Sequence, residues 1–555
     1  MLSKPVYNPK NCYVLFGVAL FILSLSVQML YAPVHCGDDF YFHMRRFKAL
    51  ALALGDGSFP FYTDYTAAEG YGYLSNVFYP NLILIPFAAL ATFIDYLPAY
   101  RLMLFSMTIL CGIFMYHAVH KIYKCHFVAF ASSLLYTFSA YRLFDLYQRA
   151  ALGETLSFTF LPLVFLGLYY ILFDNAFRRK WYVIAIGFTF MIFSHILASV
   201  LTFFLVLLIV IIAYKRIFKE PRRLLFLVAA GIVTIFLTSA FLFPLLEQML
   251  SGNFFYETNQ WALPHKSKLS IQALAEGLIP LWKNNAGTIP SIGIILCAGV
   301  LLRLFVRSGW KNNGLLKYTD IGVICGFCCI VVSSAIFPWG RFPFNHLSYI
   351  QFPWRLFEFT TFFFSIASGF YISILLRESK QRLIACIFLI LLCIGSIILH
   401  SSAYRAISCR EKEYLENTTM YDYDLGGGFE YMPAKFGSPF RVAERKDTVR
   451  YQNADTRVFD FTRAQGSTSF GVECVGEEVV ELPLFYYKGY AARMEGEVLK
   501  IKESKNGLLE VFVSRSGIVC VHYEGTNIQK ASWIITLVSS LLFCFCVLRT
   551  IRTKK

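Results

Sequence analysis

Charged residues are scarce in this chain. Only 15% of its 555 residues are Asp, Glu, Lys or Arg, whereas 57% are hydrophobic, a balance far outside the range of soluble domains. The apolar residues gather in runs of about 17 to 25, the length that crosses the hydrocarbon core of a bilayer. The composition therefore excludes a soluble globular domain and predicts a polytopic membrane protein.

Several motifs are missing as well. No GxGxxG follows a predicted strand and there is no Walker lysine, so nothing in the sequence supports ATP hydrolysis or a soluble nucleotide-sugar donor. No small-residue cleavage site follows the first apolar run, which we therefore expect to remain as a helix. The "CGFCC" stretch at 325–329 has no histidine at ligand spacing, so it predicts packing residues and not a metal site.

Acidic residues are outnumbered by basic ones, 35 against 51, which gives a net charge of +16. The basic clusters lie in short loops between apolar runs, where the positive-inside rule places cytoplasmic loops, so they indicate topology and not nucleic-acid binding. These clusters are 120–126, 177–180, 214–223, 303–311, 377–382 and 549–555. All of them fall on one side if the short, proline-containing segment 78–94 hugs the membrane or re-enters it.

This pattern predicts a polytopic α-helical cell-membrane protein of about twelve spans, with both termini in the cytoplasm. Residues 1–400 would form the transmembrane domain, with a long first outer loop at 33–100. The predicted spans lie near 12–32, 101–120, 127–141, 155–173, 181–195, 197–214, 224–244, 288–303, 317–337, 353–376, 382–400 and 532–549.

Residues 401–531 interrupt the apolar pattern. Runs such as "EVLKIKE" and "LLEVFVS" alternate apolar and polar residues as half-buried strands do, and "ESKNG" between them predicts a hairpin turn. We expect an extracytoplasmic β-rich domain here, followed at 532–555 by a last transmembrane helix and a basic cytoplasmic tail. Cys474 and Cys520 lie in this domain; a disulfide between them is possible on an oxidising face, but the sequence does not define the pairing.

Ionisable side chains collect at the outer ends of the predicted spans, where burial makes them costly and function is the first explanation to test. A carboxylate in such a place can act as a general base, and arginine binds phosphate through its planar fork. Aromatic rings there can stack on a sugar or line a lipid groove. The candidates are Asp38, Asp39, His43, Glu69, Tyr71, Arg149, Glu154, His195, Arg341, Trp354 and Arg355.

Structural roles compete with each of these assignments. Asp38 or Asp39 can cap the helix that follows them, and His195 can be a packing histidine. Arg149 and Glu154 can form a structural ion pair at a helix start. Arg355 follows a Pro–Trp at a span end and can anchor it at the interface, with Glu358 one turn later as a partner.

Four stretches carry a resemblance to a known family: "GDDFYFHMRRFKAL", "GYGYLSNVFYP", "LYQRAALGE" and "QFPWRLFEF". They resemble the bacterial membrane proteins labelled YfhO-like, and those labelled 6-pyruvoyl-tetrahydropterin-synthase-related, although no pterin-site pattern occurs here. Both groups look like members of the GT-C class of polytopic glycosyltransferases. The outer-face layout is also similar to that of the catalytic subunit of oligosaccharyltransferase.

The resemblance implies a polyprenyl-phosphate-linked sugar donor and an envelope glycan, lipid or protein as acceptor. Asp39 matches the acidic residue of the family's first outer loop and would be the base, with Asp38 beside it. Arg149 and Glu154 match the second-loop motif, and Arg355 and Arg341 would hold the donor phosphate. The remaining candidates would bind substrate. A divalent cation, Mg²⁺ or Mn²⁺, would be held by Asp39 and Glu154 if the enzyme needs one.

Two other classes compete with a transferase. A transporter or flippase of envelope precursors would be expected to show internal repeats and paired broken helices, and charges at mid-membrane. A non-enzymatic scaffold would need no carboxylate cluster. An enzyme predicts that Asp39, Glu154 and Arg355 converge around one outer-facing cavity that opens to lipid, whereas a scaffold predicts that they scatter.

Overall fold

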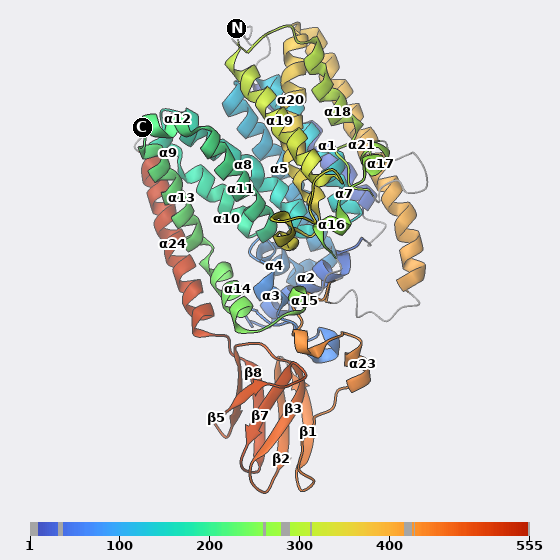
Figure 1. Cartoon of the computed structure of the whole chain (residues 1–555), viewed down its shortest axis with the longest axis vertical. Coiled ribbons are helices and arrows are strands. Elements are labelled where there is room, and N and C mark those ends of the chain that lie inside the picture. Colours follow the sequence, from blue (N-terminus) through green and yellow to red (C-terminus); the bar gives the residue numbers. More distant parts are fainter. Residues whose placement is uncertain are drawn as a thin grey trace. The chain divides into compact units, whose positions relative to one another are not determined.

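The computed structural model describes residues 9–31, 37–258, 262–278, 289–310, 313–415, 425–426, 428–464 and 466–552 (Figure 1). The chain forms two compact units. The first comprises Met1–Phe40, Leu97–Thr234 and Ala262–Glu416, and the second comprises Tyr41–Tyr96, Ile235–Trp261 and Asn417–Lys555.

The first unit is built from helices. Its longer ones are α1 (Pro9–Tyr31), α5 (Tyr96–Tyr123), α6 (His126–Thr137), α7 (Ala140–Tyr147), α8 (Leu152–Phe173), α10 (Tyr182–Ile192), α11 (Ile196–Ile212), α13 (Arg222–Leu237), α18 (Ile294–Leu301), α19 (Gly314–Ser333), α20 (Phe357–Leu375) and α21 (Ser379–Leu415). Short helices connect them: α9 (Phe177–Lys180), α12 (Tyr214–Lys219), α16 (Pro264–Ser267) and α17 (Ile271–Glu276).

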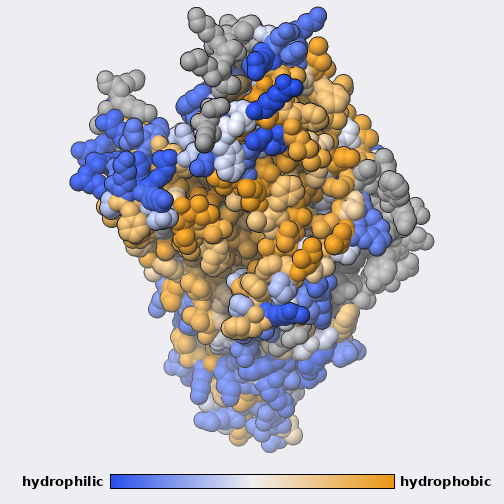
Figure 2. All heavy atoms as spheres, turned by 45° about the horizontal axis from the view of Figure 1, so that its top comes forward, coloured by the Kyte–Doolittle hydropathy of each residue, from blue (hydrophilic) through white to orange (hydrophobic). Residues whose placement is uncertain are grey.

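Within the described ranges, eight helices are long and apolar enough to cross a bilayer, which confirms a multi-pass membrane protein. Figure 2 shows hydrophobic side chains over the exposed sides of the helices. The prediction of twelve crossings goes beyond this number, because the predicted spans at 181–195, 197–214 and 288–303 correspond to shorter helices. The predicted span 224–244 is divided: α13 and α14 (Ser239–Ser251) meet at a bend of 75°.

Two glycines let α8 and α10 approach each other closely. A Cβ atom on Gly167 would lie 2.3 Å from the backbone nitrogen of Ile184, and one on Gly187 would lie 2.7 Å from that of Val164. Membrane helices lack a hydrophobic driving force between them and gain stability from such close backbone contact. These contacts hold α8, whose first turn carries Glu154, against α10.

The second unit contains a β-sandwich. Its strands are β1 (Arg457–Ala464), β2 (Ser467–Glu473), β3 (Glu478–Phe485), β4 (Tyr490–Met494), β5 (Glu497–Leu499), β6 (Ile501–Glu503), β7 (Leu508–Val513) and β8 (Gly517–Tyr523). One sheet has the order β1-β2-β8-β4-β5 and the other β3-β7-β6, with antiparallel pairing throughout. The predicted β-rich domain before the last helix is confirmed, although its strands begin only at Arg457.

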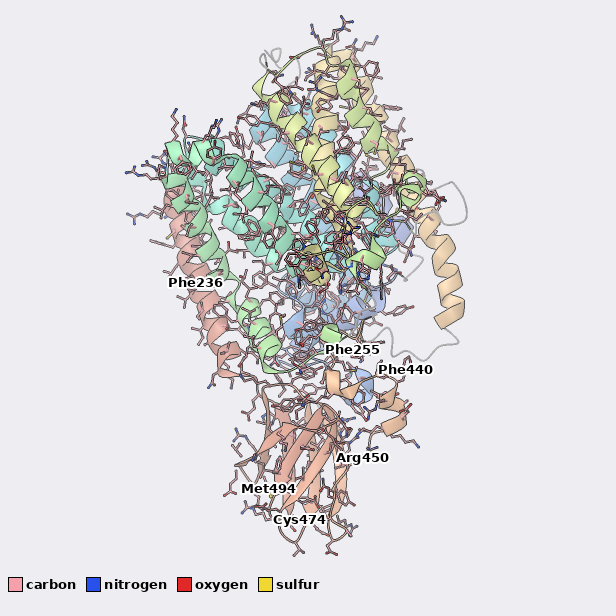
Figure 3. All side chains as sticks on the ribbon, in the orientation of Figure 1. Phe236, Phe255, Phe440, Arg450, Cys474 and Met494 are labelled. Atoms are coloured by element: carbon pink, nitrogen blue, oxygen red, sulfur yellow. The ribbon has the colours of Figure 1, made fainter. Side chains whose placement is uncertain are left out.

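The sandwich follows from the alternation in its sequence. Side chains point to opposite faces along a strand, and the inward set is buried, with Val480 opposite Val511 and Phe470 opposite Val519. The predicted "ESKNG" turn joins β6 to β7, and Gly507 adopts a φ of +73° there. The possible disulfide is absent: Cys474 and Cys520 are free thiols. Cys474 lies at one end of the strands, as labelled in Figure 3.

Most of the predicted first outer loop, residues 33–100, belongs to the same unit as the sandwich. It contains α2 (Phe40–Gly55), α3 (Ser75–Phe78) and the short apolar α4 (Ile85–Ile94), and the unit also has α15 (Phe255–Thr258) and α23 (Arg441–Arg445). The Phe485 N–H donates to the Tyr71 carbonyl at 2.9 Å, and Tyr71 itself is fully buried between Phe436 and Phe485. The loop is therefore ordered by β-strand contacts.

The last helix, α24 (Asn527–Arg552), stabilises the break before α14. The Thr536 hydroxyl oxygen accepts from the Ala240 N–H at 2.8 Å and lies 2.9 Å from the Ser239 hydroxyl. A bend in a membrane helix frees backbone groups that must find partners inside the protein. The neighbouring helix supplies one here.

Candidate functional site

The backbone of Gly37-Asp38-Asp39, which follows α1 in the sequence, is hydrogen-bonded to the turn between α7 and α8. The Asp38 N–H donates to the Gln148 carbonyl at 3.1 Å, and the Asp39 N–H donates to the Arg149 carbonyl at 2.8 Å. Gly37 permits this approach because it has a φ of +128° and a Cβ atom would lie 2.8 Å from that of Ala150. The contact fixes Asp39 beside Arg149, while the Asp38 side chain is exposed.

Glu154, in the first turn of α8, is the centre of the polar cluster. Its carboxylate accepts from Arg149 Nη1 at 2.6 Å, from Arg355 Nε at 3.3 Å and from the Tyr141 hydroxyl at 2.5 Å. Only 2% of its surface is exposed. A buried carboxylate is tolerated when it is paired and hydrogen-bonded in this way.

Arg149 links this carboxylate to a second one. The same Nη1 donates to Asp145 Oδ1 at 2.7 Å, and the guanidinium lies 4.7 Å from the centre of the Trp354 indole. Burial opposes the charge of Arg149, but Glu154 and Asp145 outweigh that effect and raise its pKa. Arg149 is therefore a fixed cation.

Arg355 reaches the cluster from a distant part of the sequence. It lies on a short 3-10 turn before α20, and its Nη1 donates to the Ile350 carbonyl and to Gln351 Oε1, both at 3.0 Å. The ion pair between Arg355 and Glu358, expected as an alternative, is not formed. The Glu358 carboxylate instead accepts from the Ser157 hydroxyl at 2.9 Å. The 3-10 turn and α20 aim the two side chains in different directions, so Arg355 pairs with Glu154.

Asp39 is half-buried at the edge of this cluster and interacts electrostatically with Arg149 and Arg355. Burial raises the pKa of its carboxyl, Arg149 and Arg355 oppose that rise, and Glu154 adds to it. The result is a carboxyl that binds a proton more readily than an exposed aspartate does.

His195 and Trp354 lie close to the same cluster. His195 Nδ1 accepts the Ala198 N–H at 3.3 Å and caps α11, which leaves the proton of the neutral ring on Nε2. The ring also interacts electrostatically with Arg355 and Glu154. Trp354 packs against Phe352 and Phe144 and covers Arg149. These two candidates therefore have a packing role as well as a position near the charges.

Four predicted residues lie elsewhere. Arg341 is exposed in the loop after α19, and no contact described for the cluster involves it. His43, Glu69 and Tyr71 belong to the second unit. His43 Nδ1 lies 3.2 Å from Arg46 Nη1, and the exposed Glu69 offers its carbonyl to Arg463.

Tyr141 and Asp145 are part of the cluster but were not among the predicted site residues. They are four residues apart on α7, with Arg149 four further on, so a helical projection would have placed all three on one face. The "AYRLFDLYQR" stretch carries this spacing.

The described donors do not fit a divalent cation well. No group of three or more His, Cys, Asp or Glu side chains is arranged to hold a metal in the part of the chain that the structure describes. The chemical reason is that the Glu154 oxygens already accept from two arginines and a tyrosine. Among the described residues, Arg149 and Arg355 are the cations that contact this carboxylate.

The helices, the sandwich and the cluster define a multi-pass membrane protein with a buried arginine–carboxylate site at the ends of its spans. No family model matches the chain, and no curated protein is significantly similar in sequence. Among solved structures it is similar to the arabinofuranosyltransferase AftD from mycobacteria, with 14% identity and a TM-score of 0.45 over 73% of this chain. The match covers 28% of AftD, and a likeness of this size defines neither fold nor activity. The YfhO-like resemblance stays a prediction.

Proposed function

We propose that this protein is a membrane glycosyltransferase of the GT-C type. It would move a sugar from a polyprenyl-phosphate-linked donor to a cell-envelope acceptor on the outer face. The observation that carries the proposal is the convergence of Asp39, Arg149, Glu154 and Arg355 in one cluster. Convergence is what a transferase requires and a scaffold does not, and the four residues come from three separate parts of the sequence.

Asp39 is the proposed base. It accepts the proton of an acceptor hydroxyl while the hydroxyl oxygen attacks the anomeric carbon of the sugar. The bond from that carbon to the donor phosphate breaks, and the electron pair leaves with the polyprenyl phosphate. Transfer by this single displacement inverts the anomeric configuration.

The arginines are the proposed holders of the leaving phosphate. A guanidinium has five N–H donors. In the described residues, the hydrogen bonds of Arg149 use Nη1 alone and those of Arg355 use Nε and Nη1. Each side chain thus keeps further donors while Glu154 fixes its position. Preorganised charges of this kind stabilise a developing anion without reorganising.

The other predicted roles belong to the proposal as well. Asp38 would assist the base, and Arg341 would hold phosphate. His195 and Trp354 would contribute to substrate binding, and a requirement for Mg²⁺ or Mn²⁺ stays a prediction. The same role for His43, Glu69 and Tyr71, which belong to the second unit, also stays a prediction. Cytoplasmic termini and an outer sandwich complete the proposed topology.

The test is a mass-spectrometric glycan profile of the cell envelope, comparing wild type, a deletion strain and Asp39→Asn at matched expression. Asp56→Asn changes an exposed aspartate of the same loop and is the control. We expect one sugar-sized modification to disappear in the deletion and in Asp39→Asn, with accumulation of lipid-linked sugar. If Asp39→Asn keeps a modification that the deletion loses, Asp39 is not the base. If the deletion changes nothing while the protein is expressed in wild type, the transferase proposal is wrong.

A further inference from the structure

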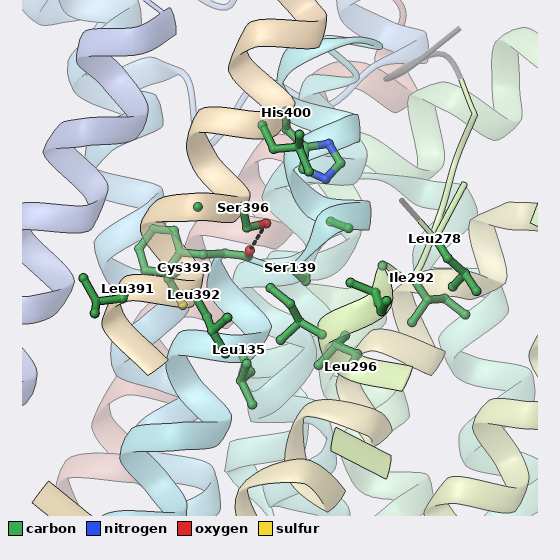
Figure 4. A pocket seen from close by; sticks show the side chains of 17 residues that line it. Leu135, Ser139, Leu278, Ile292, Leu296, Leu391, Leu392, Cys393, Ser396 and His400 are labelled. Carbon is green, nitrogen blue, oxygen red and sulfur yellow. Dashed lines mark hydrogen bonds between the residues drawn. The ribbon is translucent and has the colours of Figure 1, made fainter. Parts of the chain in front are cut away.

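The first unit contains an apolar cavity of about 280 Å³, whose lining includes none of the residues of the Glu154 cluster (Figure 4). It is lined by residues of α6, the start of α7, α18 and α21. Most of the lining is aliphatic, including Leu135, Leu296 and Leu392. At about 280 Å³, it is slightly smaller than the roughly 300–1,000 Å³ of typical ligand pockets, so it fits part of a ligand and not a whole lipid.

The cavity has a polar end. Figure 4 shows His400 at one end and Leu135 and Leu296 toward the other, with Ser396 and Ser139 between them. The Ser396 hydroxyl donates to the Phe138 carbonyl at 3.3 Å. The Ser139 hydroxyl is only 4% exposed and has no hydrogen-bond partner among the described residues. A buried hydroxyl without a partner is costly, so a bound acceptor atom at this position would be stabilising.

The cavity opens toward the lipid-facing surface of the helices. Leu391 of α21 and Ile294 of α18 both line it, yet they are 58% and 49% exposed. Gly395, between Leu391 and the polar end, has no atom within 4 Å of the place where a Cβ would lie. A ligand can therefore enter from the bilayer.

Water does not suit this space. At roughly 30 Å³ each, about nine water molecules would be needed to fill it, and each buried water needs two to four polar partners. The lining offers only two hydroxyls and one imidazole as polar side chains. An apolar chain suits both the lining and the opening.

We propose that this cavity binds one acyl chain of a bilayer phospholipid, whose ester oxygen accepts from the Ser139 hydroxyl. The aliphatic end takes the methylene chain, and the polar end takes the ester that joins it to glycerol. The glycerol backbone and headgroup stay outside. This site is separate from the proposed transferase chemistry and does not depend on it.

The test is photo-crosslinking of the full-length protein in detergent with a trace of phosphatidylcholine that carries a diazirine in its acyl chain. Label on residues 383–405 of α21 is measured against label on α24, which is largely exposed and serves as an internal reference. Gly395→Leu adds a bulky side chain to the cavity lining, at a position where nothing lies within 4 Å of the new Cβ. Gly231→Leu, at another open glycine, is the matched control.

We expect Gly395→Leu to reduce the α21 label at least fivefold and Gly231→Leu to leave it unchanged. Ser139→Ala should reduce it about two- to fivefold and provides a second, smaller change. Excess unlabelled phosphatidylcholine should displace the probe. Equal labelling of wild type and Gly395→Leu would overturn the proposal. Displacement by polyprenyl phosphate but not by phosphatidylcholine would also overturn it, because the chain would then be an isoprenoid.

Discussion

Replacing Glu154 by Gln would test whether the cluster is a buried charge network. Removing one partner of a buried ion pair costs about 3–5 kcal/mol, because the other charge is left uncompensated. The side chains of Arg149 and Arg355 are 7% and 10% exposed. Arg149 keeps its ion pair with Asp145, whereas Arg355 loses the carboxylate that it contacts. We therefore expect Glu154→Gln to destabilise the protein by about 3 kcal/mol, at the lower end of that range.

The assay is thermal unfolding in detergent followed by tryptophan fluorescence at one scan rate. A loss of 1 kcal/mol lowers Tm by roughly 2–4 °C in domains of 150–250 residues and by less in larger ones, so we expect a fall of about 5 °C. Glu378→Gln changes an exposed carboxylate at the start of α21 and should alter stability by less than about 1 kcal/mol.

A double-mutant cycle makes this prediction specific. Arg355→Gln alone leaves Glu154 with its other partners, and the double variant removes the unpaired cation that Glu154→Gln creates. The double variant should therefore cost about 1–3 kcal/mol less than the sum of the single variants. Additive effects, or an unchanged Tm for Glu154→Gln, would refute the buried ion pair between these residues.

Four further predictions follow from individual contacts. Burial raises the pKa of Asp39, so its carboxylate should become protonated, and stop acting as the base, as pH falls through a pKa above the ordinary 3.9 of aspartate. The transfer rate of wild type, measured against pH, should fall at this step. Tyr141→Phe removes one hydrogen bond to a charged group and should cost about 1.5–3 kcal/mol in thermal unfolding. Gly37→Ala should reduce activity more than stability, because the new Cβ would meet Ala150 and displace the loop that carries Asp39. A membrane-impermeant maleimide should label the exposed Cys520 thiol in intact cells if the sandwich is extracytoplasmic.

Each of these measurements has a contradicting result. An activity profile that stays flat at low pH would exclude the proposed base, and a normal Tm for the tyrosine variant would mean that its hydroxyl does not stabilise the cluster. A glycine variant with full activity would show that the loop tolerates displacement. Thiol labelling only after the membrane is permeabilised would reverse the predicted topology.

The sequence predicted the features that depend on local pattern. Apolar runs of membrane length became helices, and the alternation around "ESKNG" became the β6–β7 hairpin. Helical spacing also places Tyr141, Asp145 and Arg149 on one face. These features could be predicted because neighbouring residues determine them, through side-chain periodicity and turn conformation.

Only the tertiary structure decided which residues meet. Arg355 pairs with Glu154, which lies 201 residues earlier, and not with the nearby Glu358. His43 and Tyr71 follow Asp39 closely in the sequence, but they belong to the unit that contains the sandwich. These contacts depend on packing between segments far apart in the chain, so they cannot be predicted from local periodicity. The sequence by itself thus determined the membrane class and the candidate chemistry, whereas packing determined the ion pairs that assemble the site.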